Sequence, residues 1–176
     1  MAIEAGLNAI KGAAPEAVVM VGTYKPSADF IKAAHKGGLN AVFVNISFVG
    51  ADALAKELGA DGKGVVVSQV VPFPRDPSLK VVAEYQAALK AVDPKAEPGF
   101  VSLEGYLVGR LAIAALDKTG AKPTREGLLA AVKNTGKFDI SGLAMTLSGD
   151  DGGIGKVFLT VIQPDGSFKS VEKLTK

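Results

Sequence analysis

Two short polar corners near the start of the chain carry side chains that could hold a small molecule. Thr23 and Tyr24 follow an apolar run at 17–22, and Ser47 and Phe48 follow a second apolar run at 41–44. Their hydroxyl groups can donate and accept hydrogen bonds, and an aromatic ring offers an apolar wall. These corners are therefore the first places where we expect a function.

The chain offers few residues for catalysis or metal binding. It has no cysteine, which excludes disulfides, thiolate metal sites and cysteine nucleophiles. Its one histidine, His35, falls in the last turn of a predicted helix, where a cation complements the helix dipole. Asp150 and Asp151 stand in a glycine-rich run without the spaced ligands of a calcium loop, so we interpret it as a solvated turn. We predict no enzymatic activity, no metal and no cofactor.

Each corner joins an apolar run to an amphipathic helical pattern, at 28–38 after the first and at 51–59 after the second. Continuous apolar runs are typical of strands buried on both faces of a parallel sheet. Ligands of such sheets bind at the carboxyl ends of the strands, where both corners lie. The sequence therefore predicts an α/β fold, with a Rossmann-like parallel sheet and flanking helices.

The remaining elements follow from periodicity and from proline and glycine. Three prolines in 72–77 interrupt the chain after a predicted strand, and we place a domain boundary there. Thr124 is the expected N-cap of the last helix. We predict helices at 2–11, 77–92, 100–118 and 125–133, a strand at 65–71, and a hairpin of 157–162 with 168–171. We expect the helix at 100–118 to be buried on more than one side.

Charge and hydropathy exclude several classes of partner. The net charge is +2, and the basic residues are scattered, so nothing favours nucleic acid as a partner. No apolar run approaches the length of a membrane span, and the first residues lack the features of a signal peptide.

Seven segments, taken in order, resemble a known family. They are VGTYKPS at 21–27, FIKAA at 30–34, FVGADAL at 48–54, GVVVSQVVP at 64–72, GY at 105–106, FDISG at 138–142 and PDG at 164–166. This series resembles the leucine/isoleucine/valine-binding type of periplasmic solute receptor, the type I binding proteins of ABC importers. The likeness covers nearly the whole chain.

The resemblance implies two Rossmann-like lobes that close on a solute by hinge motion, with an ABC permease as partner and the periplasm as location. Residues 1–70 and 155–176 would then belong to the second lobe, and residues 71–154 would return to the first. Most of the first lobe would be missing, as in a C-terminal fragment. We therefore expect the 176 residues alone to bind the solute weakly or not at all, and to self-associate.

The resemblance also gives the corner residues their expected roles. In this family an aromatic residue at the position of Tyr24 contacts the solute, although the ring could instead cap the sheet edge. Thr23 and Ser27 flank it, and Ser27 is the expected N-cap of the next helix. The free amide groups of that helix start would also suit a carboxylate.

The second corner departs from the family pattern. Amino-acid receptors carry an acid there that pairs with the ammonium group of the ligand, and this chain has Ser47. A hydroxyl cannot neutralise an ammonium, so the expected solute is an amino acid or an aliphatic or aromatic acid. Phe48 is expected either to line the site or to lie in the core. Glu104 is expected to face the ligand or the other lobe.

Two other function classes stay open on the sequence alone. One is a ligand-sensing domain of the same fold in a regulatory or signalling protein. The other is a small α/β enzyme, which the lack of paired acids disfavours.

Overall fold

The computed structural model describes residues 2–121, 123–147 and 152–174, so the turn predicted at Asp150 and Asp151 lies outside the described residues. The chain forms two compact units. Unit 1 comprises Met1–Gln69 and Val157–Lys176, and unit 2 comprises Val70–Lys156. Their assignment to a second and a first lobe stays a prediction.

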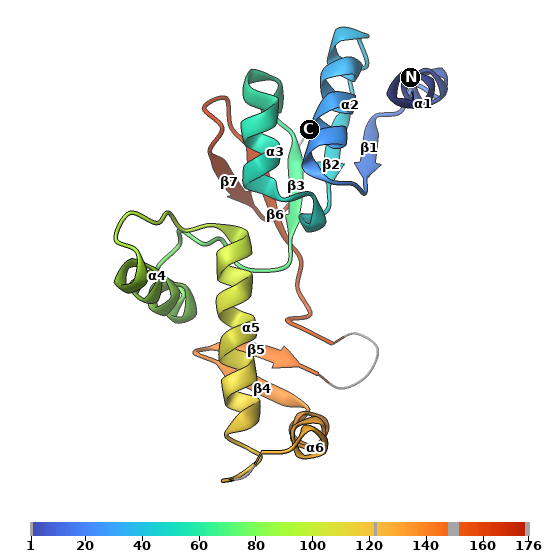
Figure 1. Ribbon diagram of the computed structural model, residues 1–176. Coiled ribbons are helices and arrows are strands. Elements are labelled where there is room, and N and C mark those ends of the chain that lie inside the picture. The colour runs from blue at the N-terminus through green and yellow to red at the C-terminus, as the bar shows by residue number, and fades with distance from the viewer. Residues whose placement is uncertain (1, 122, 148–151, 175–176) are drawn as a thin grey trace. The chain divides into compact units, whose positions relative to one another are not determined.

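Unit 1 is built on a five-stranded sheet with the strand order β1-β2-β3-β6-β7 (Figure 1). The first three strands are parallel, and β6 runs antiparallel to both β3 and β7. The predicted α/β fold with a parallel sheet is confirmed, although the sheet is mixed. The strands are β1 (Ala17–Met20), β2 (Val42–Asn45), β3 (Val66–Gln69), β6 (Phe158–Ile162) and β7 (Phe168–Val171), so the predicted final hairpin is confirmed.

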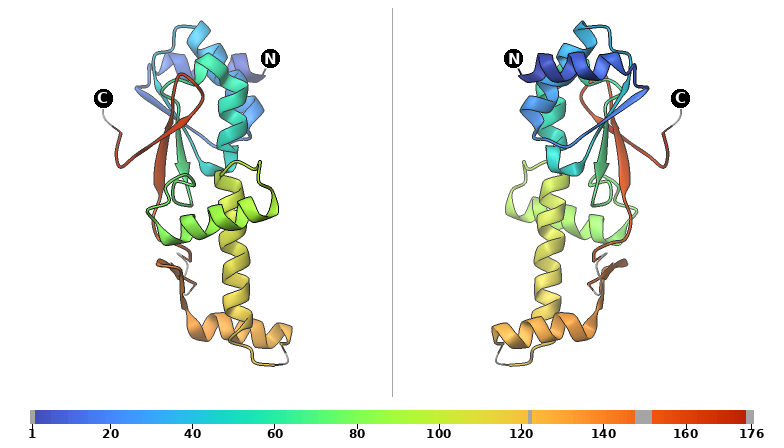
Figure 2. Two further views of the ribbon diagram at one scale, coloured as in Figure 1. Left: turned by 90° about the vertical axis from the view of Figure 1, so that its left-hand side faces the viewer. Right: turned by 90° about the vertical axis from the view of Figure 1, so that its right-hand side faces the viewer.

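The helices of unit 1 gather on one side of this sheet, as the two side views show (Figure 2). Phe43 of β2 is 2% exposed and packs edge-on against Phe30 and His35 of α2, with ring centroids 6.3 Å and 5.4 Å apart. The core of unit 1 therefore lies between these helices and the sheet. The helical segments are α1 (Ala2–Gly12), α2 (Tyr24–Lys36), η1 (Ser47–Val49), α3 (Ala51–Leu58) and η2 (Gly59–Gly62).

The opposite face of the sheet is open at its β1 edge, which corrects the prediction that these strands are buried on both faces. Val19 is 71% exposed, Val21 is 76% exposed and Val42 is 44% exposed. Among the described residues of unit 1, no helix covers this face (Figure 2). A buried strand and a half-covered one have the same apolar composition, so the sequence could not separate them.

Unit 2 contains the three predicted helices and a hairpin that the sequence did not indicate. Thr124 caps the last helix, since its hydroxyl accepts a hydrogen bond of 3.0 Å from the Gly127 N–H. The second helix exposes Val101, Val108 and Ile113 to solvent, so the prediction of burial on more than one side is wrong. The elements are α4 (Lys80–Val92), α5 (Phe100–Leu116), α6 (Arg125–Thr135), β4 (Lys137–Ile140) and β5 (Leu143–Thr146).

A hydrogen-bonded ring at the start of α5 ties it to α4. The Gly99 N–H donates to the Tyr85 hydroxyl at 3.0 Å, and that hydroxyl lies 2.6 Å from the Ser102 hydroxyl. Ser102 in turn donates to the Gly99 carbonyl at 3.1 Å. Gly99 is the N-cap of α5 and has no side chain of its own, so Tyr85 supplies part of the cap from the neighbouring helix.

An ion pair holds the turn of the β4–β5 hairpin against the same two helices. The Arg110 guanidinium donates to the Glu84 carboxylate at 2.8 Å and to the Ser141 hydroxyl at 3.2 Å. Hydrogen bonds from Ser141 and Arg110 hold the pKa of Glu84 below its usual value. Ser141 has φ +53° in the hairpin turn, and Gly142 follows at φ +89°. These contacts fix where the hairpin turns.

None of the helices in the part of the chain that the structure describes combines the length and the apolar character that crossing a bilayer requires.

Candidate functional site

The first corner lies where β1 passes into α2. Thr23 is the N-cap of α2 by its backbone conformation, with φ −81° and ψ 163°, but its side chain makes no capping hydrogen bond. Tyr24 opens the helix and is 43% exposed. Both side chains are thus available at the start of α2.

The predicted N-cap role of Ser27 is wrong. Ser27 lies inside α2, is 3% exposed, and donates its backbone N–H to the Thr23 carbonyl at 3.2 Å. The helix can begin before Pro26 because the N–H groups of a first turn have no partner within the helix, so a residue without one loses nothing.

The second corner lies where β2 passes into α3. Ser47 and Phe48 form the short turn η1, and Gly50 follows in the left-handed region with φ +75°. That conformation favours glycine and reverses the chain into α3. Ser47 is half-buried, whereas Phe48 is 68% exposed, so the alternative of a core position for Phe48 is excluded.

The register of the sheet brings both corners to the same edge. β1 and β2 are parallel neighbours, with Met20 paired to Asn45, so the next residues of both strands emerge at the carboxyl edge. Thr23, Tyr24, Ser47 and Phe48 all follow that pair within a few residues. Glu104 lies in α5 of unit 2, where it is exposed.

Asn45 is a residue of this edge that the sequence analysis missed. It ends β2, is 0% exposed, and neither its Nδ2 nor its Oδ1 has a hydrogen-bond partner. Buried amides without partners are rare in folded proteins. The only signal in the sequence was a polar residue at the end of an otherwise apolar strand.

An apolar hollow of about 310 Å³ opens beside the first corner, between α1 and α2. Its wall includes Met20 and Val21 of the first strand region, Pro26 and Phe30 of α2, and Ile3 of α1. An apolar group could therefore lie next to the exposed start of α2.

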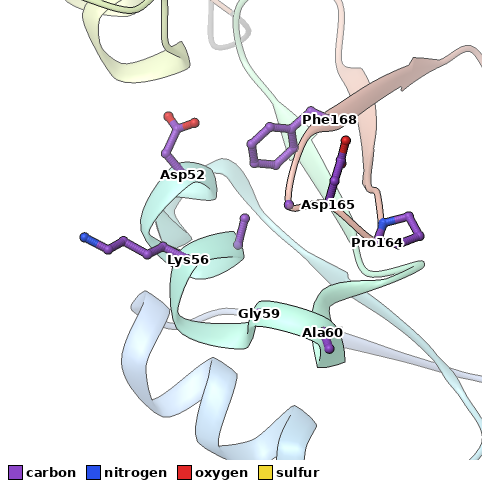
Figure 3. A pocket seen from close by; sticks show the side chains of 9 residues that line it. Asp52, Lys56, Gly59, Ala60, Pro164, Asp165 and Phe168 are labelled. Carbon is purple, nitrogen blue, oxygen red and sulfur yellow. The ribbon is translucent and has the colours of Figure 1, made fainter.

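A second hollow of about 440 Å³ lies between α3 and the turn that joins β6 to β7 (Figure 3). Its charged groups do not converge, because the Lys56 amine points away from Phe168 and from the turn (Figure 3). Hydrogen bonds from Ser167 lower the pKa of Asp165, so this carboxylate is engaged by hydrogen bonds within its own turn. We therefore place the candidate site at the two corners.

The structure also accounts for two single residues. Gln69 ends β3, where it pairs with Phe158 of β6, and its side-chain amide donates to the Thr160 hydroxyl of the same strand at 3.3 Å. His35 lies in the last turn of α2, as predicted. Within the described residues, no three His, Asp or Glu side chains gather as a metal-binding group.

Comparison with known proteins identifies the family of the chain. The family described as periplasmic binding protein matches residues 3–167. None of the curated proteins matches the chain. A possible leucine/isoleucine/valine-binding protein from Rhodopirellula baltica SH 1 is 40% identical, with a TM-score of 0.82, and the match covers 89% of this chain and 42% of that one.

Two further solved structures share the fold. An extracellular ligand-binding receptor from Verminephrobacter eiseniae ef01-2 is 28% identical, with a TM-score of 0.82 over 95% of this chain and 48% of that one. A leucine-binding protein from Thermotoga maritima MSB8 is 19% identical, with a TM-score of 0.82 over 96% and 47%. The chain spans less than half the length of these structures. It belongs to the periplasmic binding protein family and is similar to the leucine/isoleucine/valine-binding proteins of the type I fold.

Proposed function

We propose that this chain is part of the solute-binding component of an ABC importer of the branched-chain amino acid type. The observation that carries the proposal is the placement of two exposed aromatic side chains, Tyr24 and Phe48, at the carboxyl edge of two neighbouring parallel strands. In α/β sheets this edge is the usual place for ligands. The chain works as a receptor and not as an enzyme.

The solute is a small molecule that bears a carboxylate and an apolar group. The apolar hollow of about 310 Å³ beside the first corner favours the apolar group. Ser47 cannot supply the negative charge that would pair with an ammonium, so aliphatic and aromatic acids compete with amino acids as candidates. Glu104 contacts the solute, or the lobe that faces it, from unit 2.

The whole receptor acts in the periplasm. It closes around the solute by hinge motion and delivers it to a membrane permease. These statements rest on the family to which the chain belongs.

We expect Tyr24→Ala and Phe48→Ala each to weaken solute binding by roughly tenfold or more, which corresponds to about 1.4 kcal/mol. Each change removes an aromatic wall at the corner. The measurement is a thermal-shift screen of aliphatic amino acids, aliphatic acids and aromatic acids on the longest form of the protein that the gene encodes, followed by calorimetry on the stabilising compounds.

Leu129→Ala is the matched control, because Leu129 is 63% exposed and lies in α6 of unit 2. The solute affinity of this variant should be unchanged. Unchanged affinity in both corner variants would contradict the proposed site. Consumption of a stabilising compound would favour an enzyme instead. Tight binding of a solute by the 176 residues alone would contradict the proposal that two lobes close around it.

We also infer that the 176-residue chain self-associates through β1. This strand is an edge of the sheet, and it exposes Val19 and Val21 beside it. A second copy can add its own β1 in an antiparallel pair, which makes a self-complementary contact. Light scattering should show a mass above that of the monomer, and Val19→Lys should return it to the monomer. Val92→Lys, at a position 88% exposed in unit 2, should leave the mass unchanged.

A further inference from the structure

Ser27 has a hydroxyl group for which the fold provides no partner. The residue is 3% exposed, and within the described part of the chain only its backbone N–H makes a hydrogen bond, to the Thr23 carbonyl. Helix α2 begins before Ser27, so the hydroxyl does not cap the helix. A buried hydroxyl without a partner costs free energy that an alanine of similar size would avoid. A partner from outside the chain would remove this cost.

The Ser27 hydroxyl lies at the wall of the hollow between α1 and α2. This hollow has a volume of about 310 Å³, and both Ser27 and Gly22 line it. A methyl group added to Gly22 would lie 3.2 Å from the Ser27 Oγ, so the hydroxyl is next to the glycine on this wall. Gly22 has no side chain that could cover it. A molecule in the hollow can therefore reach the hydroxyl.

The rest of the wall is apolar. Among the described residues that line the hollow, Ser27 has the only polar side chain, and the others include Ile3, Met20, Val21 and Phe30. Ligand sites commonly combine such an apolar wall, which supplies contact area, with a few polar groups that select what binds. The volume of the hollow is near the lower end of the range for such sites, about 300–1,000 Å³. It therefore suits a small group, such as one aromatic ring.

We propose that Ser27 is a specificity-determining residue, which selects a solute whose apolar group carries one oxygen atom. The apolar body of that group lies between α1 and α2, and the Ser27 hydroxyl forms a hydrogen bond with the oxygen. A hydrocarbon group of the same shape would cover the hydroxyl and leave it without a partner, which costs affinity. This inference rests on the proposed function and deepens it, because it names the kind of apolar group that the solute carries.

Phenol and toluene test the inference on the 176-residue chain, because they share a ring and differ only in a hydroxyl against a methyl group. ¹H–¹⁵N NMR titrations that follow the backbone amides of Gly22 and Ser27 give an affinity for each compound, and we expect saturable shifts with phenol. In Ser27→Ala, the ratio of the phenol affinity to the toluene affinity should fall by about threefold to tenfold, the range that one neutral hydrogen bond supplies.

The Tm of Ser27→Ala separates a ligand role of the hydroxyl from a structural one. We expect the Tm to stay the same or to rise, since alanine favours a helix more than serine does and no hydrogen bond within the fold is lost. Ser170→Ala is the matched control, because Ser170 is exposed in β7 of unit 1. This variant should leave the affinity ratio unchanged.

Gly22→Ala tests the access to the hydroxyl. The φ angle of Gly22 is not positive, so alanine should fit the backbone there, but its methyl group would crowd the Ser27 Oγ at 3.2 Å. We expect this variant to lower the affinity ratio as Ser27→Ala does. Gly12→Ala is its matched control, since a methyl group at Gly12 would meet no atom within 4 Å.

Three outcomes would overturn the inference. An affinity ratio that is unchanged in Ser27→Ala or in Gly22→Ala would show that the hydroxyl does not select the ligand. A lack of saturable shifts with phenol would show that the hollow does not bind such a group. A lower Tm in Ser27→Ala would make the hydroxyl structural.

The failure of this inference is distinguishable from the failure of the proposed function. If carboxylic acids stabilise the longer protein but the affinity ratio does not respond to Ser27→Ala, only the role of Ser27 is wrong. If the ratio responds as expected but no solute in the screen stabilises the longer protein, the role of Ser27 stands and the proposed function fails.

Discussion

Phe43→Ala is expected to lower the free energy of unfolding of unit 1 by about 3–5 kcal/mol, the usual range for removing a buried phenylalanine. Phe43 is 2% exposed and joins the sheet to α2 through the rings of Phe30 and His35. Its loss leaves a cavity under the helix that also presents Tyr24. Urea unfolding followed by circular dichroism measures the effect.

The control for Phe43→Ala is Val157→Ala, which lies in unit 1 away from β1. Val157 is 66% exposed, so its truncation should change the free energy of unfolding by no more than about 0.5 kcal/mol. A loss of less than about 1 kcal/mol in Phe43→Ala would contradict the packing of α2 on this sheet.

Tyr85→Ala is expected to have a comparable effect in unit 2, about 3–5 kcal/mol. Tyr85 is 2% exposed, its ring lies 5.7 Å from that of Tyr106, and its hydroxyl helps to cap α5. The change therefore removes both packing volume and the acceptor for the Gly99 N–H. Hydrogen exchange should show faster exchange in α4 and α5, and little change in β1 and β2.

Tyr85→Phe separates the two contributions, because it keeps the ring and removes only the hydroxyl. We expect it to cost about 1–3 kcal/mol, the range for leaving a hydrogen-bond group without its partner. If Tyr85→Phe matched Tyr85→Ala, the ring would contribute nothing and our description of this contact would be wrong.

Much of the fold was predictable because its signals are local. The helices of unit 2 and the final hairpin follow from apolar spacing, Thr124 and the Pro164–Gly166 turn. The β4–β5 hairpin was missed, since its strands are only four residues each and its turn depends on Ser141 at a positive φ. That conformation is held by Arg110 and Glu84, which are distant in sequence.

The site was predictable in part. The sequence placed Thr23, Tyr24, Ser47 and Phe48 at strand ends, and the parallel register of β1 and β2 is what brings them to one edge. The start of α2 was misplaced because Ser27 is a good N-cap by type, whereas burial of Ser27 and Ala28 starts the helix earlier. The isolation of the Asn45 amide depends on three-dimensional packing and has no local signature.

The pairing of β3 with β6 has a consequence for synthesis on the ribosome. Gln69 ends β3 and pairs with Phe158, so the sheet of unit 1 stays incomplete until the last part of the chain has been translated. Unit 2 is an uninterrupted stretch from Val70 to Lys156, so all of its residues are translated before β6. A chain released after residue 157 should therefore show protease resistance in the later segment, while the earlier segment stays sensitive.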